Sequence, residues 1–166
     1  MIAFGSADHH VYQYDLRFPA NPLQVYRGHH KAVSYVAWLD KDTIVSASID
    51  GALKQWDTVA RSLKRTHKGH VNEKHFCGLG VNRSEPFIAT GSEDNNVVVY
   101  HSDISKPSFK FQFPSMPIAY PMGTSSSTAG KLKMPSTPFV TAVHWGVKNE
   151  LIACNSKGFV KVLEVV

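Results

Sequence analysis

Short segments in which apolar and polar residues alternate run through the chain. The pattern is clearest between residues 27 and 57, where three such segments follow one another: Val33, Tyr35 and Ala37; then residues 44–48; then Leu53, Gln55 and Asp57. β-Branched and aromatic residues at these positions suit a pleated strand better than a helix. The pattern therefore predicts three short strands, with a tight turn at Asp50 and Gly51 between the second and the third.

The same unit recurs along the chain. Gly28 and His29 open the central unit, and Gly69 and His70 open the next one about 41 residues later. Residues 1–17 align with the second half of a unit, which predicts that the chain begins on a second strand. Further strands are predicted at 23–26, 62–68, 76–81, 87–91, 97–100, 109–113, 140–145, 151–154 and 159–165. The sequence as a whole predicts an all-β protein.

A unit that opens on Gly-His and closes on Trp-Asp, here Trp56 and Asp57, resembles a WD40 repeat of about 40 to 45 residues. The resemblance implies a partial WD40 β-propeller of about three to three and a half blades out of a probable seven. The expected divisions are 1–17, the second half of a blade; 18–57, a blade; 58–101, a blade with Tyr100-His101 in place of Trp-Asp; and 102–166, the last blade with a flexible insertion at about 114–138. We therefore expect a fragment, a truncated gene product or half of an assembly.

Four polar residues of such a unit are expected to form a buried hydrogen-bonded chain. In the central unit these are His29, Asp50, Ser46 and Trp56, and in the next unit they are His70, Asp94, Thr90 and Tyr100. Each hydrogen bond contributes about 1 kcal/mol net, but a buried aspartate without partners costs more. The predicted role of both sets is structural.

A histidine, an aspartate and a serine are also the residues of a hydrolase triad. No serine here lies in the G-x-S-x-G turn that exposes a nucleophile, so the structural interpretation is favoured. The pairs His9-His10 and His29-His30 lack a cysteine or carboxylate at ligand spacing. No metal and no cofactor are expected.

The charge and the cysteines narrow the classes of partner. The net charge is +5, but the basic residues are scattered, which favours an acidic peptide over nucleic acid. The two cysteines, Cys77 and Cys154, form no disulfide framework, so a reducing compartment is the default. No apolar run approaches the roughly 20 residues that span a bilayer, and no membrane association is expected.

Several phrases of the sequence are more specific than the repeat itself. GSADHHVYQYDLR, ANPL, GHHKAVSYV, IVSASIDGALKQWD, KGHVNEKHFCGL and GSEDNNVVVYH together resemble the C-terminal WD40 domain of the constitutive photomorphogenic RING-type E3 ubiquitin ligases. They are also similar to the related suppressor of phytochrome A proteins. The sequence alone leaves the choice between the ligase branch and the suppressor branch open.

This resemblance implies a substrate-recognition propeller that acts in the nucleus, with exchange into the cytoplasm, in light signalling. Its expected partners are other subunits of the ligase assembly and acidic Val-Pro peptides of transcription factors and photoreceptors. The residues it implies for peptide binding are Lys31, Glu73, Phe76 and His9. No catalytic residue is expected in the chain, since a RING domain elsewhere recruits the conjugating enzyme. The alternative is a generic WD40 scaffold in another complex.

Overall fold

The computed structural model describes residues 1–114, 137–147 and 149–164, and these contain strands and connecting loops but no helix. The expected insertion at 114–138 falls almost wholly outside the described residues. The strands are β1 Ile2–Gly5, β2 His10–Tyr14, β3 Gln24–Arg27, β4 Val33–Trp38, β5 Thr43–Ser48, β6 Ala52–Asp57, β7 Ser62–Lys68, β8 Leu79–Val81, β9 Phe87–Gly91, β10 Asn96–His101, β11 Phe109–Gln112, β12 Val140–Trp145, β13 Glu150–Asn155 and β14 Val160–Glu164. The all-β prediction is confirmed.

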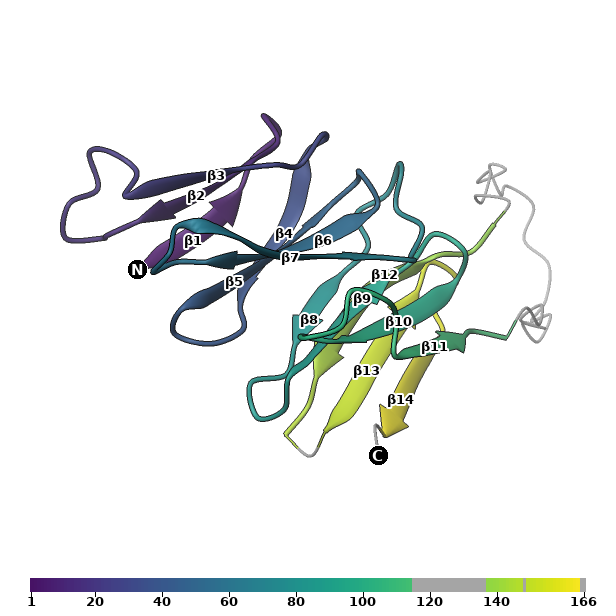
Figure 1. Cartoon of the computed structure of the whole chain (residues 1–166). Helices are drawn as coiled ribbons and strands as arrows, with labels where there is room; N and C mark the ends of the chain where they lie inside the picture. Colours follow the sequence, from purple (N-terminus) through teal and green to yellow (C-terminus); the bar gives the residue numbers. More distant parts are fainter. Residues whose placement is uncertain (115–136, 148, 165–166) are drawn as a thin grey trace, which may run out of the picture.

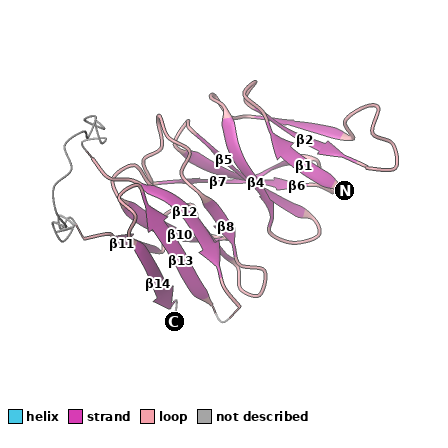
Figure 2. Ribbon diagram, turned by 180° about the vertical axis from the view of Figure 1, so that it is seen from behind, coloured by secondary structure: helices cyan, strands magenta, loops and turns pink. Residues whose placement is uncertain are grey.

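These strands form four antiparallel sheets that follow one another along the chain (Figure 1). We call them sheet A (β1-β2-β3), sheet B (β4-β5-β6-β7), sheet C (β8-β9-β10-β11) and sheet D (β12-β13-β14). Seen from behind, sheets A and D again lie at opposite ends of the molecule, with B and C between them (Figure 2). Strands β4, β8 and β12 each begin a sheet, and they contact one another or the neighbouring sheet.

The core consists of three apolar layers, one between each pair of neighbouring sheets. Val11 and Tyr26 of sheet A pack with Ile44 and Trp56 of sheet B. The layer between B and C contains Val45, Ala47, Leu53, Ile88, Val98 and Tyr100, and the layer between C and D contains Ala89, Val97, Val99, Val143, Trp145, Leu151 and Ala153. Sheets B and C are thus apolar on both faces, which is why all six residues of β5 are buried.

Glycine allows neighbouring sheets to approach closely at two junctions, between A and B and between C and D. A Cβ atom on Gly5 would lie 2.5 Å from the Val33 side chain, and one on Gly91 would lie 2.5 Å from the Val140 carbonyl oxygen. The same junctions are closed by hydrogen bonds, since Val33 N donates to Ser6 O and Val140 N donates to Ser92 O. The start of one sheet is therefore fixed to the β-turn of the sheet before it.

Because the strands are antiparallel, alternate connections lie at the same end of the sheets. The β1-β2, β3-β4, β5-β6, β7-β8, β9-β10 and β13-β14 connections share one end, which we call the loop face. The sheets also divide the chain differently from the sequence units, because β3 pairs with β2 in sheet A although residues 24–27 fall in the predicted range 18–57. Those ranges stay a prediction.

The predicted strand at 76–81 begins later than expected. Phe76 and Cys77 belong to the β7-β8 loop, and β8 starts at Leu79. The loop is longer than its counterpart between β3 and β4, and its backbone is held by a side chain of the next turn, as described below. The first part of the segment in which alternating apolar residues predicted a strand is therefore a loop.

Candidate functional site

The four residues expected to bind a peptide all lie on the loop face. His9 is in the β1-β2 turn, where its φ angle is 76°, and Lys31 is in the β3-β4 loop. Glu73 and Phe76 share the β7-β8 loop, and the Phe76 side chain is 58% exposed. Since Phe76 does not pack into the core, it is available to a partner.

The β5-β6 turn connects the two loops that carry Lys31 and Phe76. Ser48 Oγ donates a hydrogen bond to the Lys31 carbonyl oxygen at 3.1 Å. On its other side, Gly51 lies against the main chain of Asn72, whose carbonyl oxygen would be 3.7 Å from a Cβ at that glycine. Lys31 and the β7-β8 loop are therefore neighbours on the same face, whereas among the described residues His9 forms no hydrogen bond or ring contact with either.

Glu93 in the β9-β10 turn holds the β7-β8 loop in place. Its Oε1 atom accepts three main-chain hydrogen bonds, from the amides of Glu73 at 2.9 Å, Lys74 at 2.6 Å and His75 at 2.7 Å. Burial would raise the pKa of the Glu93 carboxyl, but these amides lower it below its ordinary value, so the carboxylate stays charged. A fixed anion thus shapes the loop that presents Glu73 and Phe76.

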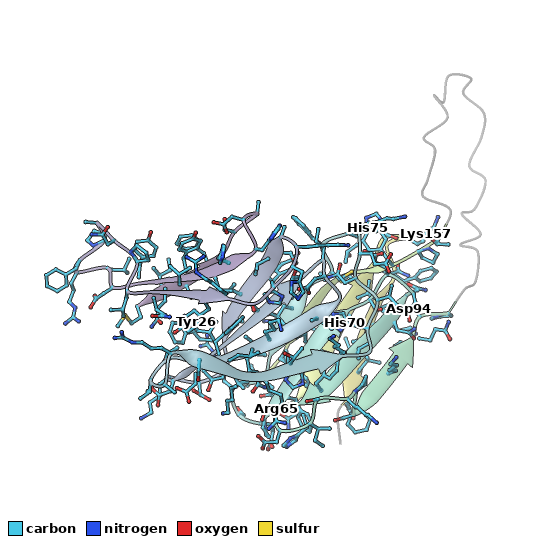
Figure 3. The ribbon with its side chains drawn as sticks, turned by 45° about the horizontal axis from the view of Figure 1, so that its top comes forward. Tyr26, Arg65, His70, His75, Asp94 and Lys157 are labelled. Carbon is cyan, nitrogen blue, oxygen red and sulfur yellow. The ribbon has the colours of Figure 1, made fainter. Side chains whose placement is uncertain are left out.

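An aromatic pair extends this surface toward sheet D. The rings of His75 and Phe139 stack with their centroids 4.1 Å apart and their planes within 14°. Figure 3 shows His75 and Lys157 close to one another at this end of the molecule, with Asp94 nearby and Arg65 far from them. The exposed His75 ring therefore lies beside the half-buried Phe139 ring, with the half-buried Lys157 side chain close to them on the loop face.

Beneath this face the structure joins the four polar residues of sheet B. Trp56 Nε1 donates to Ser46 Oγ at 2.8 Å, and Ser46 Oγ lies 2.8 Å from His29 Nε2. His29 Nδ1 donates to Asp50 Oδ2 at 2.9 Å, because a carboxylate only accepts. Burial would raise the pKa of Asp50, but the His29 ring and the His30 amide lower it well below its ordinary value.

The corresponding chain in sheet C differs from the prediction. His70 Nδ1 lies 2.8 Å from the Tyr100 hydroxyl, but Thr90 Oγ1 donates to the carbonyl oxygens of Gly78 and Gly91. The exposed side chain of Asp94 bonds to Ser92 and Asn96. A tyrosine hydroxyl extends further than an indole nitrogen and meets the histidine directly, which leaves Thr90 and Asp94 outside the chain.

Two buried histidines surround the Tyr100 ring. His67 packs against it with a centroid distance of 5.2 Å, and His67 Nδ1 donates to the Ile104 carbonyl at 2.8 Å. Neither His67 Nε2 nor His70 Nε2 has a partner among the described residues. Burial lowers the pKa of both rings, that of His70 to about 4, so both are neutral at neutral pH.

The geometry of sheet B does not present a nucleophile. Ser46 is completely buried, and its oxygen accepts from the Trp56 indole, so it cannot meet a substrate in this conformation. In residues 1–114, 137–147 and 149–164, no three His, Cys, Asp or Glu side chains gather as metal ligands. The described part of the chain also contains no helix of the length and hydropathy needed to span a membrane.

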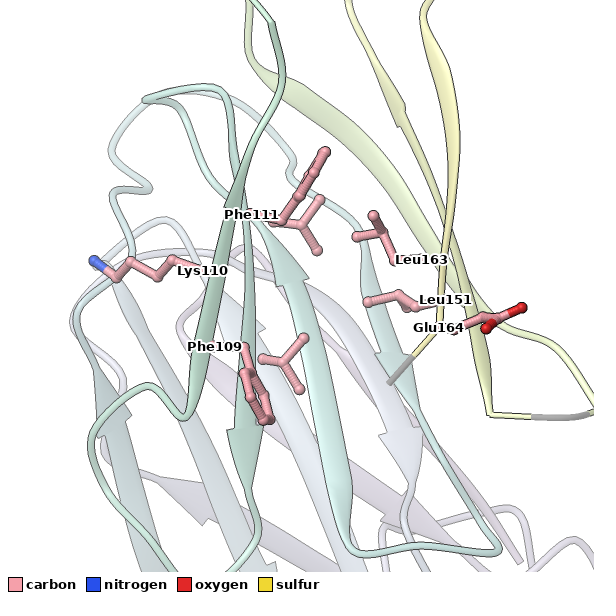
Figure 4. A pocket seen from close by; sticks show the side chains of 8 residues that line it. Phe109, Lys110, Phe111, Leu151, Leu163 and Glu164 are labelled. Carbon is pink, nitrogen blue, oxygen red and sulfur yellow. The ribbon is translucent and has the colours of Figure 1, made fainter. Parts of the chain in front are cut away.

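A groove on the outer side of the molecule is the other hollow of interest. It lies between β11 and β14, has a volume of about 230 Å³, and is lined mainly by apolar side chains such as Phe109, Phe111 and Leu163 (Figure 4). Lys110 at its rim already donates to the Gly69 carbonyl through Nζ. The lining offers little polar chemistry to select a ligand, so the loop face is the stronger candidate.

Sequence reasoning missed Glu93 and His75. Their roles depend on the path of the β7-β8 loop, which the order of apolar residues does not predict. One signal was available: the connection from Gly69 to Leu79 is longer than that from Gly28 to Val33, and a longer loop on a fixed scaffold needs an anchor of its own.

Comparison with known proteins identifies the repeats and their relatives. The family described as "WD domain, G-beta repeat" matches residues 20–57 and 61–101. The chain is 45% identical over 163 residues to the E3 ubiquitin-protein ligase COP1 of Pisum sativum, covering 98% of this chain and 22% of that protein. It is 40% identical over 173 residues to Protein SPA1-RELATED 4 of Arabidopsis thaliana, covering 99% of this chain and 20% of that protein. It therefore spans about a fifth of the length of these relatives.

A solved structure has the same arrangement of sheets. The WD40 β-propeller domain of Doa1 superposes with a TM-score of 0.69, at 18% identity, over 96% of this chain and 45% of that chain. At that level of identity the likeness concerns the fold alone.

Proposed function

We propose that this chain, a partial WD40 propeller that is similar to the COP1 and SPA proteins over nearly its whole length, recognises protein substrates for a ubiquitin ligase. The predicted fold and the predicted resemblance are both confirmed by these comparisons. The observation that supports the function is the exposed Phe76 on a loop that Glu93 holds by three main-chain hydrogen bonds.

The ligand that fits this surface is a short acidic peptide with a Val-Pro core. An exposed aromatic side chain on a rigid loop loses little conformational freedom when a partner covers it, so Phe76 is suited to anchor the apolar core. Lys31 would attract an acidic residue of the peptide. Glu73 would repel peptides that carry a second acidic residue next to its carboxylate. The net charge of +5 favours the approach of an acidic partner.

Fluorescence polarisation with a labelled acidic Val-Pro peptide tests the proposal on the 166-residue chain. Phe76→Ala should weaken binding by about 30-fold or more, as for a central aromatic anchor. Lys31→Glu should weaken it by less, about 2- to 5-fold, because an exposed ion pair contributes only about 0.2 to 1 kcal/mol.

Two control variants match these changes on the opposite end of the sheets. Phe18→Ala removes a 74% exposed phenylalanine from the β2-β3 loop, and Lys106→Glu reverses an exposed charge in the β10-β11 loop. Both should bind like the unchanged chain. Absence of binding by the folded chain, or equal losses in the Phe76 and Phe18 variants, would overturn the proposal and leave a generic WD40 scaffold.

The wider setting of the function is part of the same proposal. Similarity to an E3 ligase and to SPA proteins supports a role as a subunit of a ligase assembly, with transcription factors and photoreceptors as substrates in light signalling. The place of action would be the nucleus. Co-expression with a RING subunit, followed by measurement of substrate ubiquitination with and without Phe76→Ala, tests this setting separately from peptide affinity.

A further inference from the structure

Two segments at the outer edge of sheets B and C gather the excess positive charge of the chain. Residues 61–69 contain β7, the last strand of sheet B, and residues 102–112 contain the β10-β11 loop and β11, the last strand of sheet C. Together they contain one acidic residue, Asp103, and six basic residues: Arg61, Lys64, Arg65, Lys68, Lys106 and Lys110. Their net charge is therefore +5, equal to that of the whole chain, so the basic and acidic residues elsewhere balance.

Hydrogen bonds hold the two segments against each other. Lys68 N donates to the Ser105 carbonyl oxygen at 3.1 Å, and Lys110 Nζ donates to the Gly69 carbonyl oxygen at 2.6 Å. Basic residues that are scattered in the sequence are therefore brought together by the fold. We call the surface that they form the basic rim and define it by four residues: Lys64, Arg65, Lys68 and Lys110.

The register of the strands directs two of these side chains toward the junction between sheets B and C. Arg65 lies opposite Gln55, whose Nε2 atom donates to the Ser102 carbonyl oxygen of sheet C at 3.0 Å. Lys110 lies opposite Val98, which belongs to the apolar layer between B and C. Residues directly opposite one another in an antiparallel pair project from the same face. Arg65 therefore projects toward sheet C, and Lys110 projects toward sheet B.

No carboxylate in the part of the chain that the structure describes forms an ion pair with the basic rim. The ion pairs of that part join other groups, and Asp103 itself lies 4.0 Å from His101 Nδ1. The three lysines of the rim are exposed, and the buried Arg65 Nε has no hydrogen-bond partner among the described residues. Cations gathered in this way create a positive potential that favours an anionic partner.

The main chain of β7 offers little to an added strand. At its end, the Lys68 amide is already bonded to Ser105. In its middle, Lys64 is an extra residue, because Arg65 pairs with Gln55 and Leu63 pairs with Trp56. A bulge and an occupied amide both oppose the extension of a sheet at its edge. A partner of the basic rim would therefore be held by the basic side chains and not by main-chain hydrogen bonds.

We propose that the basic rim binds an extended acidic segment of a partner protein, with at least three carboxylates within about six residues. Lys64 and Lys68 are separated by about 13 Å along the strand, the length of about four extended residues. The guanidinium of Arg65 suits a carboxylate, which it can bind through two hydrogen bonds. A single-stranded nucleic acid fits less well, because the Phe109 ring beside Lys110 lines the groove toward sheet D and Ile104 next to the rim is aliphatic.

Fluorescence anisotropy with a labelled peptide of six glutamates tests the proposal on the whole 166-residue chain. We expect saturable binding at about 50 mM salt that weakens at least about tenfold at about 200 mM salt, because the contact is electrostatic. Replacing both Lys64→Glu and Lys68→Glu should weaken binding at the lower salt concentration by at least about tenfold. If the folded chain does not bind this peptide, the proposal is wrong, and the lysines only protect a strand edge from aggregation.

A second double variant separates the basic rim from the overall charge. Lys41→Glu with Lys161→Glu changes the net charge by the same amount, at exposed positions in the β4-β5 loop and in β14. This variant should bind the glutamate peptide within about twofold of the parent chain. Equal losses in the two double variants would contradict the proposal, because overall charge would then explain the binding. Unchanged circular dichroism of both variants separates loss of binding from unfolding.

Two further measurements identify the partner class and the surface. An oligothymidylate with six phosphates should bind more weakly than the glutamate peptide at the same salt concentration, and tighter binding would exclude an acidic protein segment as the preferred partner. Phe76→Ala should leave binding of the glutamate peptide unchanged, since Figure 3 shows Arg65 far from His75, which precedes Phe76 in the chain. A loss in this variant would place the glutamate peptide on the loop face and not on the basic rim.

Discussion

Trp56 and Tyr100 occupy the same position in neighbouring sheets, yet their polar atoms bond to different partners. Trp56 Nε1 donates to Ser46 Oγ at 2.8 Å, whereas the Tyr100 hydroxyl lies 2.8 Å from His70 Nδ1 without an intervening hydroxyl side chain. The two sheets therefore stabilise the loop face by chains of different length. This difference leads to distinct expectations for substitutions in each sheet.

Asp50→Ala should lower the free energy of unfolding by about 2 to 3 kcal/mol, because it leaves the His29 ring without its acceptor and the His30 amide unpaired. Urea denaturation monitored by Trp fluorescence gives the value. Asp94→Ala is the control: its side chain is exposed and does not bond to His70, so a loss below about 1 kcal/mol is expected. Equal losses would contradict the assigned difference between the two chains.

Tyr100→Phe should cost about 1 to 3 kcal/mol, since it removes the partner of His70 Nδ1 in a ring whose other nitrogen is already unpaired. The substitution keeps the packing of the ring against His67, which isolates the hydroxyl. Tyr35→Phe, at a tyrosine that is 37% exposed, is the matched control and should leave the melting temperature unchanged. A Tyr100→Phe variant as stable as the parent chain would show that this hydrogen bond contributes nothing net.

Stability should fall as the solution is acidified from about pH 6.5 to about pH 4. Burial lowers the pKa of His70 from 6.5 to about 4, so the unfolded chain takes up this proton first. The neutral His70 ring therefore contributes to the free energy of unfolding fully above pH 6.5. This contribution, on the order of 3 kcal/mol, is lost as the pH falls toward 4. His67 shifts in the same direction.

Urea midpoints at about pH 7 and about pH 4.5 measure this dependence, and His70→Gln should flatten it. At neutral pH the variant should be less stable than the parent chain, because it lacks the His70–Tyr100 hydrogen bond. The difference in free energy of unfolding between the two proteins should become smaller as the pH falls. If the stability of the parent chain and of the variant changes with pH in parallel, a group other than His70 causes the pH dependence.

Glu93→Ala should release the β7-β8 loop. Each hydrogen bond to a charged acceptor contributes about 1.5 to 3 kcal/mol, so the amides of Glu73, Lys74 and His75 should exchange with deuterium at least about tenfold faster. Glu93→Gln keeps an acceptor oxygen without the charge, so its amide exchange rates should lie between those of the parent chain and those of Glu93→Ala. If exchange at these amides is unaffected by Glu93→Ala while the fold persists, the carboxylate does not hold the loop.

The sequence predicts most of the strands, because the Ile44 to Ser48 and Val97 to Tyr100 segments are β-branched, apolar and bounded by turns. It also predicts the hydrogen-bonded set of sheet B, since a serine, an aspartate and a tryptophan at fixed positions have few other ways to be satisfied when buried. The prediction of a strand is wrong at Phe76, which lies in a loop. The predicted role of Thr90 is wrong because the Tyr100 hydroxyl reaches His70 directly and Thr90 bonds to main-chain carbonyls instead. Those outcomes depend on distances between segments that no local pattern specifies.

The β9-β10 turn has a consequence for how the molecule responds to a ligand. Ser92 Oγ accepts from the Val71 amide, Glu93 binds the loop that carries Phe76, and Ser92 O accepts from the first residue of β12. Two separate parts of the chain, the β7-β8 loop and the first residue of β12, are thus hydrogen-bonded to two consecutive residues. A peptide bound at Phe76 would restrain the β7-β8 loop, and through Ser92 and Glu93 it would also restrain the start of β12 in sheet D.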